Sequence, residues 1–508
     1  MMSNVQQVLL LPEIIQKTAS YCGYREQRDL AYTCRWFFSL VAPVIWKEVR
    51  GVETVIKLIP GAKVSKLYNT RRYEEAHHRN IILDESILNA DWTRYWYYAP
   101  FVRHIMLSSS LQGHMGAIIQ VWGWRFLFMK LQGSVLLPNL RNLDTQGLYF
   151  SSHFDRLACF VLLLSPSLQK LSLHDMSPAG PANGLPATRP LSLLLGAISK
   201  SSVADSSRIV ATRDQWHPSE ETLASLSPSE YPEGSFWFSN LSAPTGLRDL
   251  EITLLSPSTL WDEFCIIGFL PFLERLKTYF YIDFSKEVKY NLKTTTLPPG
   301  LFPSLRALSL NNTSHVDLFR WTWSLKTMVS RLSSAHIDLP NFGSNCQSLM
   351  VNFAQLIHDN SPSLMDLSLG LIYASREMGA LEIACELLST IPLQALTLKL
   401  DYRSVKVGDY PSAYSESTFH HLRRLHISSE FNTSDWATLP KIAKAFPNLE
   451  YLNITSSDES ESYEPLDISC IDHTAFQPIN IQILAQYVER SSREDEGKWE
   501  IIRPDITK

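Results

Sequence analysis

The sequence predicts an α/β fold in which short parallel strands line one side of a solenoid and helices cover the other side. Three observations lead to this prediction. A leucine triplet of the form L-x-x-L-x-L recurs along the chain, and between residues 247 and 449 its copies start roughly 26 to 32 residues apart. Amphipathic helical runs lie between the copies, and turn-forming residues with proline precede several of them.

The triplet has the alternation of a half-buried strand. In residues 361–369, Leu367 and Leu369 lie two positions apart and face the same side of an extended backbone, while Asp366 and Ser368 face the other. A strand this short needs neighbours of the same kind to bury its leucines. Clear copies begin at Leu168, Leu247, Leu305, Leu364, Leu393, Leu422 and Leu449, and weaker copies begin at Val102, Leu140, Leu273 and Leu332.

Helices are predicted between the strands at residues 154–164, 260–270, 349–358, 378–388 and 437–446. A Ser-Pro-Ser, Phe-Pro-Ser or Phe-Pro-Asn turn precedes several strands, because proline stops a helix and Ser or Asn suits a turn. Each unit is therefore strand, loop, helix and turn, the organisation of a leucine-rich repeat. The usual buried Asn or Cys after the strand is missing, so the solenoid is expected to be irregular. Its place is taken by Met176, Leu255, Thr313, Ile372, Asp401, Glu430 and Ser457.

The composition limits the possible classes of protein. With 508 residues, of which 45% are apolar and 19% charged, the chain is globular rather than disordered. A formal net charge of −5 gives no basic excess, which argues against nucleic acid as the main partner. The seven cysteines form no C-x-x-C pair and are predicted to be reduced thiols of an intracellular protein.

The N-terminus lacks the features of an export signal. The apolar residues 8–11 are too few for a signal core, and no basic segment precedes them. The apolar stretch 113–138 contains Arg125 and Lys130, so neither a membrane span nor a membrane partner is predicted. The expected location is cytoplasmic, nuclear or both.

Residues 1–50 are predicted to form a separate module of three short helices. Pro12 suits the first position of a helix, and Gly23 is expected to follow its end. An amphipathic run over residues 30–41 predicts the second helix. Pro43 is expected to open the third.

These residues resemble an F-box. The segments LPEII (11–15), DLA (29–31), TCRWF (33–37) and PVIW (43–46) have the order and spacing of that family's motifs, although Thr18 and Cys22 stand where the family has larger apolar residues. The resemblance implies that the module docks on a Skp-family adaptor and through it on a cullin. The residues that it places in contact with the adaptor are Leu11, Pro12, Ile14, Ile15, Leu30, Cys34, Trp36 and Trp46.

Residues 51–100 are predicted to link the module to the repeats and to cap them. A short helix is expected at 53–60 and an exposed charged connector at 61–80. The segment 91–103 resembles the one that leads into the repeats of fungal F-box proteins with leucine-rich repeats. Its aromatic cluster has two interpretations, a cap over the first repeat or a stacking platform for bases or sugars, and the cap is preferred. The cluster comprises Trp92, Tyr95, Trp96, Tyr97 and Tyr98.

Residues 101–490 are assigned to the repeats. An insert at 177–243, rich in Pro, Ser, Gly and Ala, is predicted to be disordered apart from a helical patch at 191–198; a regulatory role for it is the alternative. The acidic run 456–462 is interpreted as a solvated loop or, less simply, as a phosphorylation site. A last helix is predicted at 479–488, followed by a fraying tail at 491–508.

No catalytic arrangement emerges from the sequence. It contains no Gly-rich phosphate loop, no G-x-S-x-G elbow and no H-E-x-x-H helix, and the adjacent histidines at 77–78 and 420–421 are expected to point apart. We therefore predict no catalytic residue, no cofactor and no metal site. The outward strand positions are better candidates for binding a protein, and Lys399, Arg424, His426 and Tyr451 are chosen because Tyr and Arg are typical anchors.

Two functions are compatible with these patterns. The resemblance implies a substrate-recognition subunit of an SCF-type E3 ubiquitin ligase, in which the F-box binds the adaptor and the repeats bind a target protein. The alternative is a leucine-rich-repeat scaffold or inhibitor that binds a partner protein without any link to a ligase.

Overall fold

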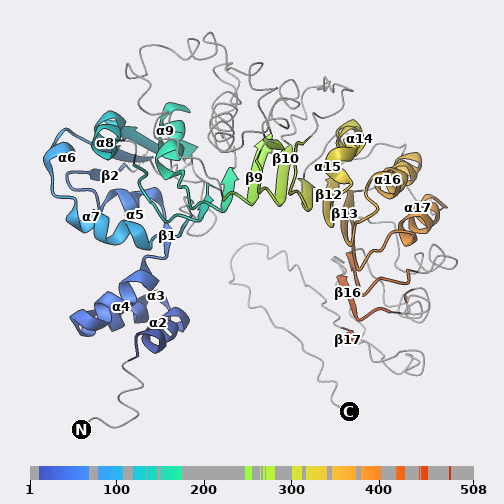
Figure 1. Ribbon diagram of the computed structural model, residues 1–508, viewed down its shortest axis with the longest axis horizontal. Coiled ribbons are helices and arrows are strands. Elements are labelled where there is room, and N and C mark those ends of the chain that lie inside the picture. The colour runs from blue at the N-terminus through green and yellow to red at the C-terminus, as the bar shows by residue number, and fades with distance from the viewer. Residues whose placement is uncertain are drawn as a thin grey trace, which may run out of the picture. The chain divides into compact units, whose positions relative to one another are not determined.

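The computed structural model divides the chain into two compact units, Met1–Leu308 and Ser309–Lys508, which are described separately (Figure 1). It describes residues 11–67, 78–106, 118–132, 134–145, 149–150, 153–173, 246–254, 264, 267–268, 270–280, 300–311, 316–339, 346–372, 379–401, 419–428, 446, 448–455 and 480–481. The predicted insert, the acidic run and the tail lie outside these residues. So do most of the predicted helices at 260–270 and 437–446.

The first unit contains a parallel sheet built from the predicted triplets. Its strands follow one another in chain order, and their bounds are β1 (Glu48–Arg50), β4 (His104–Met106), β6 (Asn142–Asp144), β8 (Lys170–Leu173), β9 (Asp249–Leu254), β10 (Arg275–Phe280) and the start of β11 (Ala307–Asn311). Every strand after β1 contains the second half of a predicted triplet. The leucines point inward, and Leu171, Leu250 and Leu276 are buried. The triplet strands of this unit are confirmed.

A hydrogen-bond ladder joins the strands where they begin. The oxygen of Arg103 accepts from the backbone N–H groups of Arg141 and Asn142, at 2.8 and 2.9 Å, and the next two strands repeat this pattern at the oxygens of Arg141 and Gln169. Side chains of the turns add a second set of hydrogen bonds between successive repeats. The donors and acceptors are Asn139 Nδ2 to Pro100 O (2.9 Å), Ser165 Oγ to Pro138 O (2.6 Å), Ser304 Oγ to Pro271 O (2.7 Å), Ser361 Oγ to Val329 O (3.1 Å) and Asn448 Nδ2 to His420 O (2.6 Å). The Ser and Asn residues of the proline turns thus bind neighbouring repeats together.

A second sheet lies in the same unit and corrects one prediction. Its order is β2 (Lys63–Leu67), β3 (His78–Ile82), β5 (Ile118–Trp122) and β7 (Tyr149–Phe150). Residues 61–80 were predicted to be an exposed connector, but they contain β2 and the start of β3, which pair antiparallel. The charged side chains of this segment obscure the strand pattern in the sequence. The strands form because β3 pairs with the apolar β5 and buries Ile81. Tertiary pairing therefore outweighs local polarity here.

The helices of the first unit are short. Their bounds are α2 (Pro12–Tyr21), α3 (Tyr24–Thr33), α4 (Arg35–Ile45), α5 (Val52–Ile56), α6 (Ser86–Asn89), α7 (Thr93–Tyr98), the 3-10 helix η1 (Ala99–Phe101), α8 (Trp124–Leu131) and α9 (His153–Leu163). The helix predicted at 154–164 is confirmed by α9. The one predicted at 53–60 is shorter than expected, since α5 ends at Ile56 and buried turn residues follow it.

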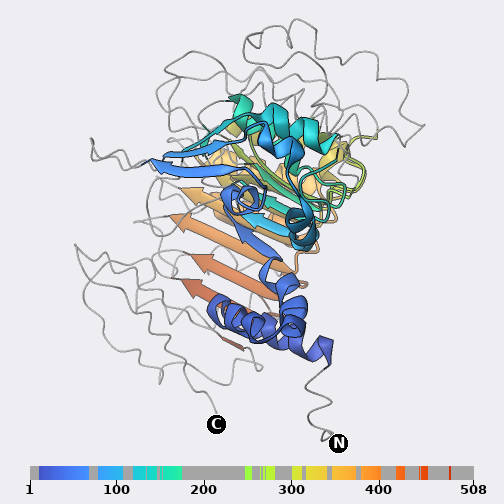
Figure 2. The same cartoon turned by 90° about the vertical axis from the view of Figure 1, so that its left-hand side faces the viewer.

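In the second unit, parallel strands and helices alternate along the chain over residues 316–401, and the described residues after these contribute further parallel strands. The strands run in the order β12 (Ser334–Leu339), β13 (Asp366–Ile372), β14 (Ala395–Asp401), β15 (Arg424–Ser428), β16 (Tyr451–Thr455) and β17 (Asn480–Ile481). The strands lie side by side and point the same way (orange to red in Figure 2). Leu367, Leu396, Leu425 and Leu452 occupy one register row, so the leucines stack from strand to strand.

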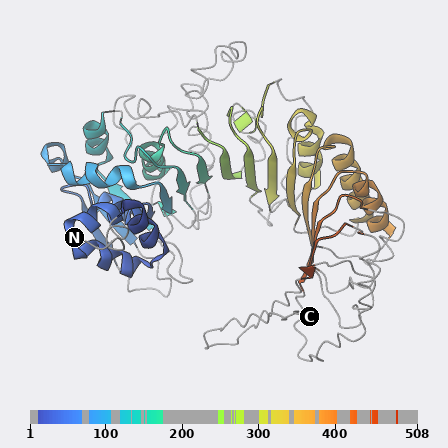
Figure 3. The same ribbon diagram turned by 60° about the horizontal axis from the view of Figure 1, so that its bottom comes forward.

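Helices cover one face of this sheet (gold to orange in Figure 3). They are α14 (Val316–Ser324), α15 (Lys326–Val329), α16 (Cys346–Asn360) and α17 (Gly379–Ser389). The helices predicted at 349–358 and 378–388 are confirmed by α16 and α17. The helix predicted at 479–488 is wrong at its start, because Asn480 and Ile481 pair in parallel with Tyr451 and Leu452 as β17.

The chain is thus an α/β protein with a long parallel sheet. Within the residues that the structure describes, no helix has both the length and the apolar character needed to cross a membrane.

Candidate functional site

The N-terminal helices α2, α3 and α4 form a small module (residues 11–46, called the helical module) with a minimal core. Ile15, Ala19, Ala31 and Val41 form its buried cluster, and the partly buried Leu30, Phe37, Phe38, Leu40, Val44 and Ile45 pack against them. Ala42 on α4 is buried as well. Gln27 ties two helices together, because its Nε2 donates to the backbone oxygens of Ala19 (2.9 Å) and Cys22 (3.0 Å). So small a core leaves many side chains of the module in water.

Large apolar side chains are among those left in water. Leu11, Ile14 and Trp36 are 47%, 39% and 39% exposed. Leu11 and Ile14 lie in one turn at the start of α2, where the N–H of Ile14 donates to Leu11 O at 3.1 Å. Three tyrosines that the sequence did not single out are more exposed still: Tyr21, Tyr24 and Tyr32. A tyrosine is compatible with a buried or an exposed position, so the sequence held no clear signal for these three.

The eight residues expected to contact an adaptor are placed in three different environments. Leu11, Pro12, Ile14, Cys34 and Trp36 are exposed, Leu30 and Trp46 are partly buried, and Ile15 is buried in the core. Ile15 therefore holds the helices together. A partner that binds the helical module can contact the five exposed residues of the set directly.

Two predicted helix boundaries in the module are wrong. The run 30–41 was predicted to be one helix, but α3 ends at Thr33 and α4 begins at Arg35. Cys34 between them is extended (φ −162°, ψ 167°), and the Thr33 hydroxyl donates to Leu30 O at 2.8 Å, a local bond that competes with helical ones. Pro43 lies inside α4 instead of opening a third helix.

Aromatic rings connect the helical module to the segment after it. The Trp46 ring lies 4.8 Å from that of Tyr98, and Phe38 stacks on Tyr97 with centroids 6.5 Å apart and planes at 9°. Trp46, expected to bind an adaptor, therefore has an intramolecular partner.

The aromatic cluster of residues 92–98 packs mainly on its own unit. Trp92 and Tyr95 are buried, Trp92 Nε1 donates to Ile87 O at 3.0 Å, and the Tyr95 hydroxyl donates to Leu136 O. Burial raises the pKa of Tyr95 well above its usual value. Trp96 and Tyr97 remain exposed. Two of the rings are therefore inaccessible to a stacked base or sugar, which favours the capping interpretation.

The residues expected to bind a target lie on neighbouring strands of the second unit. In the register, Arg424 stands opposite Tyr451, His426 stands opposite Thr397 and Asn453, and Lys399 stands opposite Ser428. Arg424, His426 and Tyr451 alternate with the buried leucines and so lie on the polar face of β14–β16, and Lys399 occupies the equivalent register position on β14. Arg424 is exposed, and His426 and Tyr451 are half-buried.

This polar face carries few internal charge pairs. Among the residues that the structure describes, neither Arg424 nor Tyr451 has a side-chain hydrogen bond or an ion pair. The cross-strand ion pair nearest in sequence, Arg423 Nη1 to Glu450 Oε1 at 3.2 Å, lies one residue before each strand begins.

Strands β9 and β10 of the first unit are different. Arg275 forms a bidentate pair with Asp249, with both N–O distances at 2.5 Å, and Lys277 Nζ lies 2.8 Å from Glu251 Oε1. The hydrogen bonds that Arg275 donates to Asp249 raise the pKa of Arg275. Burial raises the pKa of Tyr279, whose hydroxyl donates to Glu251 Oε1 at 2.9 Å. The charges of this face neutralise one another.

A metal site or a nucleophilic site places specific requirements on the titratable side chains that form it. They contain no group of three or more His, Cys, Asp or Glu side chains placed to hold a metal ion. Cys159 is buried, and burial raises the pKa of its thiol, which keeps it protonated and unreactive. Asp155, also buried, accepts from Trp124 Nε1 at 2.8 Å and thereby fixes α8 to α9.

No family model matches this chain, and no curated protein matches it either. Its surfaces are therefore interpreted from their own chemistry.

Proposed function

We propose that this chain is the substrate-recognition subunit of an SCF-type ubiquitin ligase. The helical module binds a Skp-family adaptor, and the polar face of β14–β16 binds the target protein. The chemistry of ubiquitin transfer belongs to other subunits, and this chain raises the local concentration of the target beside them.

One observation carries the proposal: the helical module exposes Leu11, Ile14 and Trp36 while only five of its residues are buried. Exposed apolar groups gathered on so small a module are typical of a protein-binding surface. They also belong to the motifs that resemble an F-box, namely LPEII (11–15) and TCRWF (33–37). A partner that covers them supplies the burial that the module lacks on its own.

The test is co-purification of the full chain with a Skp-family adaptor. The triple variant Leu11→Ala, Pro12→Ala, Ile14→Ala is expected to lose the adaptor, because truncation of a well-packed interface anchor costs about 2 kcal/mol or more. Ile383→Ala is the matched control, since Ile383 is an exposed apolar residue of similar size on α17. The control is expected to retain the adaptor fully.

The same experiment decides against the proposal in two ways. If the triple variant still binds the adaptor, the helical module is not part of the interface. A wild-type chain that captures a partner protein but no adaptor supports the scaffold or inhibitor function instead. Thermal unfolding of each variant shows that the changes act on binding, since the exposed side chains contribute little to stability.

A further inference from the structure

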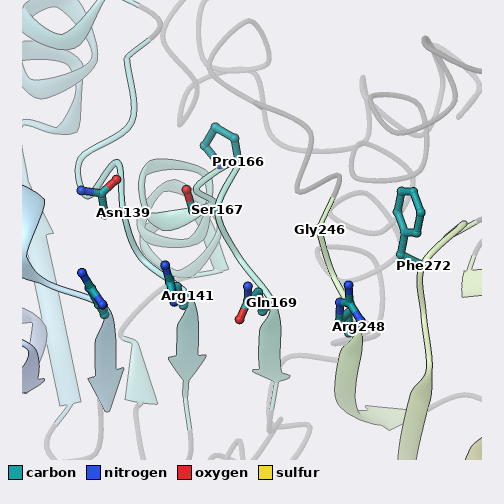
Figure 4. Close-up of a pocket in the computed structure, with 9 residues that line it drawn as sticks. Asn139, Arg141, Pro166, Ser167, Gln169, Gly246, Arg248 and Phe272 are labelled. Atoms are coloured by element: carbon teal, nitrogen blue, oxygen red, sulfur yellow. The ribbon is translucent and has the colours of Figure 1, made fainter.

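The parallel sheet of the first unit carries a pocket at the edge where its strands begin (called the edge pocket). Its volume is about 510 Å³. Arg141, Gln169 and Arg248 stand at the starts of adjacent strands and line it, with Asn139 in the turn before and Phe272 at one side (Figure 4). Arg103 lines it as well.

The polar residues of the row are placed by the repeat itself. Arg103, Arg141, Gln169 and Arg248 each follow the first residue of a triplet, so each occupies the same position at the start of β4, β6, β8 or β9. The backbone ladder through their amides and carbonyls holds them in register. Adjacent strands lie about 4.8 Å apart, so the row from Arg103 to Arg248 spans about 14 Å.

The edge pocket is strongly cationic. No Asp or Glu is among the described residues that line it. Arg103 and Arg141 have no side-chain hydrogen bond or ion pair within the described part of the chain, whereas Arg248 Nη1 contacts Glu274 Oε1 at 2.6 Å. The pKa of the neighbouring His104 is lowered, first by burial and then by the positive charges of Lys47, Arg103 and Arg141, although Glu48 opposes this.

One side of the edge pocket is apolar. Phe272 is among the most exposed large apolar side chains of the described residues, and it lines the pocket at one side (Figure 4). The turns are rigid, because Asn139 Nδ2 donates to Pro100 O at 2.9 Å and Ser165 Oγ donates to Pro138 O at 2.6 Å. The site therefore offers fixed cations next to an uncovered ring.

We propose that the edge pocket binds an extended acidic segment of a partner protein, with its carboxylates on Arg103 and Arg141 and an apolar side chain on Phe272. Arginine suits this role because its guanidinium group pairs with a carboxylate through two parallel hydrogen bonds. The length of the row favours an extended chain over a single anion, since successive same-side residues of an extended peptide lie about 6.6 Å apart. The proposal is independent of the adaptor and of the polar face of β14–β16.

The test is fluorescence anisotropy of the full chain with a labelled peptide of six glutamates and one phenylalanine. A peptide with lysines in place of the glutamates is the charge control. The double variant Arg103→Glu, Arg141→Glu is expected to weaken binding about tenfold or more, because the new charges repel the ligand. Arg25→Glu, Arg125→Glu changes the net charge by the same amount at two exposed residues that do not line the pocket, and it is expected to change binding by less than about twofold.

Further arms separate the alternatives. Phe272→Ala is expected to weaken the peptide with phenylalanine and to leave an all-glutamate peptide unchanged. Equal weakening by both double variants means that net charge alone attracts the peptide, and this overturns the proposal. So does competition by inorganic phosphate at the concentration of the peptide, which indicates a single-anion site. Arg103→Gln, Arg141→Gln is the milder variant to use if the reversal disturbs folding.

Discussion

Strands β9–β10 and strands β15–β16 have the same architecture but differ in their polar faces. In both pairs the leucines of the triplet are buried, and polar side chains alternate with them. On β9–β10, each of the cations Arg275 and Lys277 faces a carboxylate on the next strand. On β15–β16, Arg424 stands opposite Tyr451. A face that pairs its own charges has little left for a partner, whereas Arg424, which has no ion pair with any residue that the structure describes, is available to one.

The first prediction tests the shared architecture and has the largest expected effect. Leu276→Ala in β10 and Leu425→Ala in β15 each remove a fully buried leucine and are expected to cost about 2–5 kcal/mol of unfolding free energy. Denaturant unfolding measures the loss. Met365→Ala, an exposed apolar residue just before β13, is the control and is expected to cost far less. If one of the two leucine variants is tolerated, the two regions do not have equivalent cores.

The sequence predicted this architecture because it depends on local periodicity. Leucines at fixed offsets define the strand and its buried face, so every predicted triplet appears as a strand. Helices α9, α16 and α17 were predicted for the same reason, since each has an apolar stripe of helical period and a proline turn near its end. The second sheet was missed because the charged residues of β2 and β3 conceal strands that depend on pairing with β5.

The candidate sites were predicted less completely than the fold. The break at Cys34 was missed because the apolar spacing continues through it, while the chain direction changes at a single extended residue. The edge pocket was not expected because Arg103, Arg141 and Arg248 are far apart in the sequence and meet only when the strands stack. Aligning the triplets reveals that they share one position, but their common surface exists only in the folded sheet.

The second prediction tests the difference between the polar faces. Arg424→Glu with Tyr451→Ala is expected to abolish capture of the target, because loss of two anchors costs about 2 kcal/mol or more, roughly thirtyfold in affinity. Arg275→Glu with Tyr279→Ala is the matched control. It changes the same residue types on the polar face of β9–β10, where the charges pair with one another (called the self-paired face). Quantitative mass spectrometry of the proteins that co-purify with each full-length variant measures the outcome. Equal loss in both variants would place recognition elsewhere.

The third prediction concerns the self-paired face and has the smallest expected effect. Asp249→Asn removes the carboxylate that Arg275 holds with two hydrogen bonds of 2.5 Å. The Arg275 side chain is 64% exposed, so water already screens much of the attraction, and the expected cost is about 0.5–1 kcal/mol. Asp366→Asn in β13 is the control, because Asp366 stands opposite Ser334 and Ala395 instead of a cation.

The salt dependence of the same pair of variants sharpens the comparison. The difference in unfolding free energy between Asp249→Asn and Asp366→Asn is expected to shrink in about 1 M salt, where the screening length falls to about 3 Å. A difference that persists at high salt means that Asp249 acts through the geometry of its hydrogen bonds rather than through its charge. In that case directed hydrogen bonds hold the side chains of the self-paired face in place. These side chains are then kept from binding a partner by their fixed geometry as much as by the cancellation of their charges.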